Sequence, residues 1–191
     1  IEDDHCGDIS LAEDVSIGQF LPDRCVHIRS YSKSHGPDLR IAAVGGAAEV
    51  IDPMVARRML GPGWTSRLLQ AVLLDLLTHA DPQESVRQAR IAYTRRGTLL
   101  REKLKDRGVA ASPGDGINVW IPVEDERSAL ITLAAAGIRV APGSPFVVTA
   151  DSTTRDAIRV TTGRLPDDED RIEDVASIIA RAAGSAGGTL R

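Results

Sequence analysis

Residues 30–40 read Ser30-Tyr31-Ser32-Lys33-Ser34-His35-Gly36-Pro37-Asp38-Leu39-Arg40. They follow an alternating segment, residues 24–29, that predicts a short strand. Lys33 is the only lysine among the first 102 residues and lies seven positions before Arg40. A lysine must lose its proton to act as a nucleophile, which desolvation or a nearby positive charge favours. Serine hydroxyls and a guanidinium also suit a phosphate. The local chemistry predicts an amine nucleophile beside a phosphate site, with an ordinary surface loop as the alternative.

The composition excludes several classes of protein. The chain has 191 residues, a net charge of −4, 42% apolar and 26% charged residues, which is typical of a globular protein rather than a disordered one. Mild acidity argues against non-specific nucleic-acid binding through bulk charge. No apolar run approaches the roughly 20 residues of a membrane helix. Cys6 and Cys25 alone make neither a disulfide framework nor a zinc site, so we expect a cytoplasmic protein. The start at Ile1, without a signal peptide, suggests a fragment or a processed chain.

The pattern along the chain predicts an α/β fold. Apolar periodicity predicts helices over residues 65–79, 83–107, 126–136 and 167–183, and strands over 24–29, 41–45, 117–123, 138–140 and 157–162. Basic residues along 83–107 are interpreted as a solvated helix face. A break near 80–83 separates two predicted domains, residues 1–80 and 81–191, the second ending in a flexible tail over 184–191.

Four segments in order carry a resemblance to a known family. The pattern Ser-x-Ser-Lys-x-x-x-Pro-x-x-Arg at residues 30–40 is similar to the cofactor-lysine segment of class I/II aminotransferases of fold type I, which use pyridoxal 5′-phosphate (PLP). The spacing between Lys33 and Arg40 also matches this family. Three further segments extend the resemblance: Glu2-Asp3-Asp4-His5 upstream, and Val140-Ala141-Pro142-Gly143-Ser144-Pro145-Phe146 and Ile158-Arg159-Val160 downstream. Among these proteins, the chain looks most like the aminotransferase-like domain of MocR/GntR-type regulators.

The resemblance implies a role for each matched residue. Lys33 would form the aldimine with PLP and shuttle the α-proton. Asp3 would pair with the pyridine nitrogen and keep it protonated. Arg159 would bind the carboxylate of an amino acid. The cofactor phosphate would be held by Ser30, Ser32 and Arg40. His5, in place of the usual tyrosine, would donate to the phenolic oxygen. The alternatives are an exposed chain-end acid for Asp3, a chain-end residue without contacts for His5, a surface ion pair for Arg40 and a solvated strand residue for Arg159.

The resemblance covers only the C-terminal half of the fold. Residues 1–80 would be the C-terminal part of the large, mainly parallel-sheet domain, and residues 81–191 the small α+β domain. The missing half would leave strand edges exposed. We expect, first, an aminotransferase acting on an amino acid or other primary amine and, second, a PLP- and effector-binding sensor of a MocR-type regulator. A homodimer is implied, without a metal and without direct nucleic-acid binding by this segment. A fragment that no longer binds cofactor is the third alternative.

Overall fold

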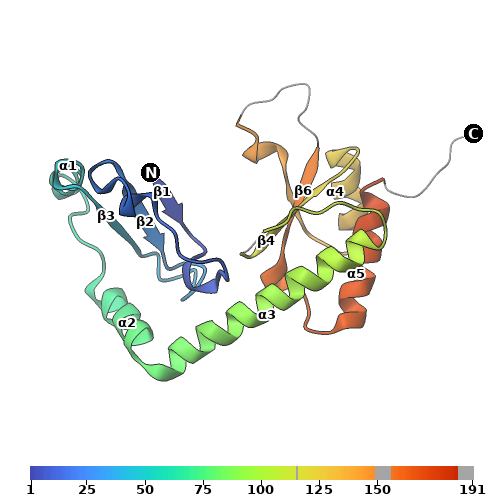
Figure 1. The fold of residues 1–191 in the computed structure, drawn as a ribbon, viewed down its shortest axis with the longest axis horizontal. Coiled ribbons are helices and arrows are strands. Elements are labelled where there is room, and N and C mark those ends of the chain that lie inside the picture. Colours follow the sequence, from blue (N-terminus) through green and yellow to red (C-terminus); the bar gives the residue numbers. More distant parts are fainter. Residues whose placement is uncertain (115, 149–155, 185–191) are drawn as a thin grey trace, which may run out of the picture. The chain divides into compact units, whose positions relative to one another are not determined.

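A computed structural model describes residues 1–114, 116–148 and 156–184, so most of the predicted tail over 184–191 lies outside the described residues. The chain divides into two compact units, Ile1–Arg90 and Ile91–Arg191, with the division inside a long helix (Figure 1). Each unit is described separately. The domain boundary at residue 80 stays a prediction.

A three-stranded sheet organises the first unit. Its strands are β1 (Glu2–Asp4), β2 (Val26–Ser30) and β3 (Ala42–Gly46), in the order β1-β2-β3. The first pair is parallel and the second antiparallel. Since parallel strands end at the same edge of a sheet, β1 and β2 deliver their following residues, His5 and the loop that holds Lys33, to one edge. The strand β1 has no counterpart among the sequence predictions.

Two helices follow the sheet, and only the second is predicted. The helix α2 (Arg67–Thr78) agrees with the prediction over 65–79, and the Ser66 hydroxyl caps it by accepting the amide of Leu69 at 3.4 Å. The helix α1 (Ala48–Met59) was not predicted. It contains Pro53, which lacks an amide donor and ordinarily argues against a helix interior.

The first unit exposes much of its apolar surface. Every residue of β3 is exposed, and so are four large apolar side chains of α1: Val50, Met54, Val55 and Met59. Only four apolar side chains within residues 1–90 are buried: Ile9, Cys25, Leu39 and Leu73. β3 also lies at the end of the strand order β1-β2-β3, so it pairs on one side only among the described residues.

The second unit has its own antiparallel sheet. The strands β4 (Asn118–Pro122), β5 (Ala141–Pro142) and β6 (Ala157–Thr161) lie in the order β4-β6-β5. The helices are α3 (Ala80–Lys105), α4 (Glu126–Ala135) and α5 (Glu169–Ala182). Short 3-10 turns complete the chain: η1 (Gly7–Ile9), η2 (Ile17–Gln19), η3 (Pro22–Arg24), η4 (Ser144–Phe146) and η5 (Thr162–Arg164).

Two sequence predictions are wrong in this region. Residues 138–140 form no strand, because the Ile138 amide donates to Leu133 at 2.8 Å and so completes the end of α4 beyond Gly137, whose φ is +76°. The break predicted near 80–83 is misplaced by a few residues, because α2 and α3 are separated at His79. Pro82 lies in the first turn of α3, where proline is tolerated because the first amides of a helix have no partner inside it.

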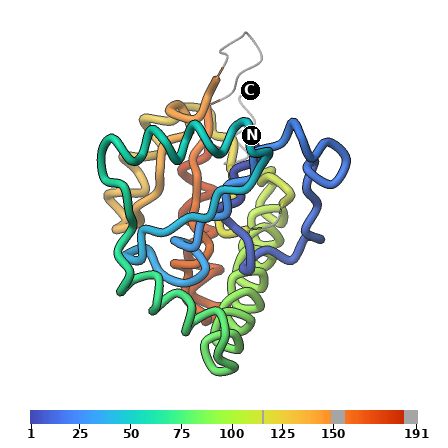
Figure 2. Tube along the Cα trace, turned by 90° about the vertical axis from the view of Figure 1, so that its left-hand side faces the viewer, coloured from blue at the N-terminus to red at the C-terminus, as the bar shows by residue number. Residues whose placement is uncertain are grey.

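The core of the second unit lies between the sheet and the helices. Its fully buried members include Leu100, Leu104, Val119, Ile121, Leu133, Ile158, Ile172 and Ile179. The helix α5 lies beside the C-terminal part of α3 in both views (Figures 1 and 2). Lys103 there pairs with Glu169 at 3.1 Å and Glu173 at 3.2 Å. The predicted solvated basic face is thus partly wrong, because the acidic start of α5 covers it. Among the described residues, no helix is both long and apolar enough to cross a bilayer.

Candidate functional site

Lys33 lies in the loop that joins β2 to β3. The loop begins with the Tyr31 amide donating to the Ile41 carbonyl at 3.2 Å, which extends the strand pairing by one step. A turn over residues 32–35 follows, closed by the His35 amide donating to Tyr31 at 2.9 Å. Lys33 is exposed in this turn and its amine has no partner among the residues that the structure describes. The amine is thus available for a ligand.

The same loop gathers the groups predicted to hold a phosphate. Ser30 ends β2, and its hydroxyl accepts the Ser32 amide at 3.4 Å. Arg40 has a φ of +50°, the only positive φ of a non-glycine residue in the described ranges. That conformation costs an L-residue about 1–2 kcal/mol. Strain of this kind persists where the surroundings enforce it, often at ligand sites. Two hydroxyls, an exposed guanidinium and a free amine in one loop fit the donor set that PLP requires.

Three carboxylates share β1, and strand alternation separates them. Glu2 and Asp4 point to one face of the sheet, where they meet His27 and Arg29 of β2, while Asp3 points to the other. The Glu2 carboxylate accepts from the Ser16 hydroxyl at 2.6 Å, from the Ile17 amide and from His27 Nδ1 at 3.1 Å, and these bonds lower its pKa to about 2.

Asp3 is the free carboxylate of the three. It is exposed and has no partner within the described part of the chain, and its register partner is Ile28, opposite Val44. His5, just beyond the end of β1, is exposed as well. Asp3 rather than Glu2 or Asp4 is therefore available to a cofactor nitrogen, as the resemblance implies.

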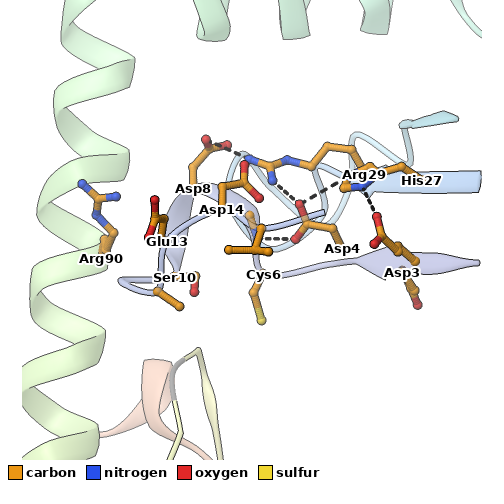
Figure 3. A pocket seen from close by; sticks show the side chains of 14 residues that line it. Asp3, Asp4, Cys6, Asp8, Ser10, Glu13, Asp14, His27, Arg29 and Arg90 are labelled. Carbon is orange, nitrogen blue, oxygen red and sulfur yellow. Dashed lines mark hydrogen bonds and ion pairs between the residues drawn. The ribbon is translucent and has the colours of Figure 1, made fainter. Parts of the chain in front are cut away.

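The face of β1 opposite Asp3 carries a cluster that the sequence analysis missed. Arg29 pairs with Asp4 and, at 2.9 Å, with Asp8 (Figure 3). A hollow of about 550 Å³ is lined by these three residues and also by Asp3. Burial is the largest single effect and opposes both charges, but the hydrogen bonds and ion pairs of the two groups together outweigh it, lowering the pKa of Asp4 and raising that of Arg29. Opposite charges at alternate positions, Glu2 and Asp4 against His27 and Arg29, are a signal that could have revealed the cluster.

Arg159 belongs to the second unit. It lies on β6 between Trp120 of β4 and Ala141 of β5. Its guanidinium carbon stands 4.4 Å from the centre of the Phe146 ring, and the edge of Trp120 meets that ring at 6.0 Å between centroids. Its Nε is buried without a hydrogen-bond partner among the described residues. A buried donor without a partner costs about 1–3 kcal/mol, which a bound carboxylate would offset.

Glu126, at the start of α4, holds the loop that carries Phe146. Its carboxylate accepts the amides of Gly143 at 2.7 Å and Ser144 at 2.8 Å, and the Ser144 hydroxyl at 2.7 Å. Burial works against the charge of Glu126, but these bonds lower its pKa. The sequence analysis missed Glu126, because nothing local links it to a loop 17 residues further along.

Gly143 allows this loop to pass close to the sheet. A Cβ there would lie 2.6 Å from the Ala157 carbonyl oxygen and 2.9 Å from a ring carbon of Trp120. We expect Gly143→Ala to lower the free energy of unfolding by about 1–3 kcal/mol, the usual cost of overpacking. Urea unfolding measures the loss. Gly61→Ala is the control, since a Cβ at Gly61 meets nothing within 4 Å. Equal stability of the two variants would contradict the prediction.

Comparison with known proteins gives the fold. Aspartate aminotransferase from Thermus thermophilus, solved with maleate, superposes with a TM-score of 0.79 over 94% of this chain and 47% of its own, at 24% identity. The chain has part of the type I aminotransferase fold. LysN, an α-aminoadipate aminotransferase that is also from Thermus thermophilus, matches with a TM-score of 0.78 over 96% of this chain and 49% of its own, at 19% identity. At these identities the likeness concerns the fold alone.

Sequence comparison finds a similar protein that is a transcriptional regulator. The chain is 38% identical over 143 residues to the vitamin B6 salvage pathway transcriptional repressor PtsJ of Salmonella typhimurium, a match that covers 74% of this chain and 33% of PtsJ. The predicted resemblance to the aminotransferase-like domain of MocR-type regulators is thereby confirmed. The chain spans a third of that relative and about half of the aminotransferases that share its fold. No protein-family model matches it.

Proposed function

We propose that this chain is part of the PLP- and effector-binding domain of a MocR-type transcriptional regulator. The observation that carries the proposal is the 38% identity to the repressor PtsJ, which exceeds the 24% and 19% identities to the enzymes above. His5, which replaces the tyrosine usual at this position in the group, supports the proposal because the loss of that tyrosine fits a relaxed catalytic demand. DNA binding would belong to another part of such a protein.

In this proposal one set of residues binds the cofactor and Arg159 binds the effector. PLP, when bound, supplies an electron sink for amine chemistry. Lys33 holds it covalently, while Ser30, Ser32 and Arg40 bind its phosphate and Asp3 binds the ring nitrogen. Arg159 binds the carboxylate of an amino-acid effector, in a fork that a flat carboxylate matches. His5 donates a hydrogen bond to the phenolic oxygen.

An aminotransferase is the second candidate, favoured by the fold and by the free amine of Lys33. The two candidates differ in turnover. We expect the protein, as the cell makes it, to develop a visible absorbance band with PLP, to change that band on addition of an amino acid, and to release no oxo acid over hours. The absorbance spectrum and an oxo-acid assay measure this. Sustained oxo-acid release would make the chain part of an enzyme, and a failure to take up PLP would refute both candidates.

A further inference from the structure

The cluster on the face of β1 opposite Asp3 has no part in the proposed function, although it surrounds the segment that presents Asp3 and His5. β1 is only three residues long and pairs with β2 along all three. The side chains of Glu2 and Asp4 add further bonds to this pairing. Glu2 is tied to His27 and to the turn that begins at Ser16, and Asp4 is tied to Arg29.

Arg29 is the centre of this arrangement. Its guanidinium pairs with Asp4 at the end of β1 and with Asp8 in η1, so it spans the turn that contains His5 (Figure 3). Asp4 also accepts the Gly7 amide at 2.8 Å. Gly7 has a φ of +43°, and a Cβ there would overlap the guanidinium. The turn therefore packs closely against the guanidinium of Arg29, and glycine is favoured at position 7 because a side chain would be strained at this φ and would displace the guanidinium.

We propose that Arg29 is a positioning residue for the cofactor site, which holds Asp3 and His5 in place by pairing with Asp4 and Asp8 from the opposite face of β1. The inference rests on the proposed function, because Asp3 and His5 matter only if PLP binds. Arg29 pairs with neither Asp3 nor His5, and the effect passes through the backbone of β1 and its turn. Ile9, whose side chain is only 1% exposed, anchors the far end of that turn.

The test compares three variants of the complete natural protein. Arg29→Met removes both ion pairs and keeps the length of the side chain. Arg29→Lys keeps the charge but loses the planar fork that reaches two carboxylates. Arg24→Met is the control, because Arg24 is exposed and forms no ion pair with the described residues. Should Arg29→Met fold poorly, Asp8→Asn weakens a single pair and replaces it.

Three readouts are measured: the absorbance spectrum with PLP, the affinity for PLP, and hydrogen exchange of residues 2–9 without cofactor. For Arg29→Met we expect faster exchange, a displaced absorbance maximum and a loss of affinity of about tenfold. Arg29→Lys should restore part of the protection from exchange, of the absorbance maximum and of the affinity for PLP. Arg24→Met should match the wild type in all three. Faster exchange with an unchanged spectrum and affinity would make Arg29 merely structural and overturn the inference alone. A wild type without an absorbance band would refute the proposed function, and the inference with it.

Discussion

The Lys33→Ala protein is expected to bind PLP without forming the visible absorbance band. The reason is chemical, since a carbonyl condenses with a free amine, and the guanidinium groups that dominate this chain stay protonated and are poor nucleophiles. The sequence holds 20 arginines and three lysines, so few other positions can replace Lys33. Lys33→Arg should lose the band as completely, although it keeps the charge.

The control for this prediction is Lys105→Ala. Lys105 is exposed on α3 and forms no ion pair within the described ranges, whereas Lys103 is paired with Glu169 and Glu173, and its loss would remove two ion pairs. We expect Lys105→Ala to keep the full band. A band of normal intensity in Lys33→Ala would refute the assignment of the cofactor lysine, whatever the fold.

The Arg159→Gln protein is expected to bind amino acids about tenfold to a hundredfold more weakly. A hydrogen bond to a charged group contributes about 1.5–3 kcal/mol, and the buried Nε of Arg159 has no protein partner in the described residues to compete with a ligand. Titration of the PLP-loaded protein with an amino acid measures the change. Its affinity for PLP should stay the same, because Arg159 is assigned to the effector and not to the cofactor.

Two comparisons make the prediction for Arg159 specific. A primary amine without a carboxylate should bind equally well to Arg159→Gln and to the wild type. Arg181→Gln, on the exposed side of α5, should leave the affinity for amino acids unchanged. If Arg159→Gln weakens both ligands alike, Arg159 acts on the shape of the site, and its role as the carboxylate partner is wrong.

The sequence predicted the elements whose signal is local. The helices α2, α4 and α5 follow from apolar spacing. In the structure, Ser66 and Asp168 also cap their helices, each accepting an amide of the first turn. The loop around Lys33 follows from its small, polar and turn-forming residues, together with a resemblance that comparison confirmed for the fold and the family. Local patterns of this kind need no knowledge of distant residues.

Two of the features that were missed depend on contacts between distant residues. β1 consists of three acidic residues, a composition unfavourable for a strand, and its place in the sheet depends on partners 25 residues away. The contact between Glu126 and the loop at Gly143 is another case. The helix α1 was not predicted because Pro53 argues against a helix at that position. The predicted strand at 138–140 is wrong because the Ile138 amide donates to Leu133 at the end of α4. For β1 and Glu126, contacts between distant residues outweigh local preference, whereas the end of α4 is set by a local backbone bond and α1 buries no residue.

Reduction of the PLP-loaded protein with borohydride, followed by digestion and mass spectrometry of the peptides, tests the cofactor site most directly. Reduction makes the bond between cofactor and lysine permanent, so the modified peptide identifies the lysine that binds PLP. We expect the label on Lys33, in the peptide that carries Ser32 and Ser34. A label on Lys103 or Lys105, or a protein with no labelled peptide, would contradict the assignment of Lys33 and of the loop around it as the cofactor site.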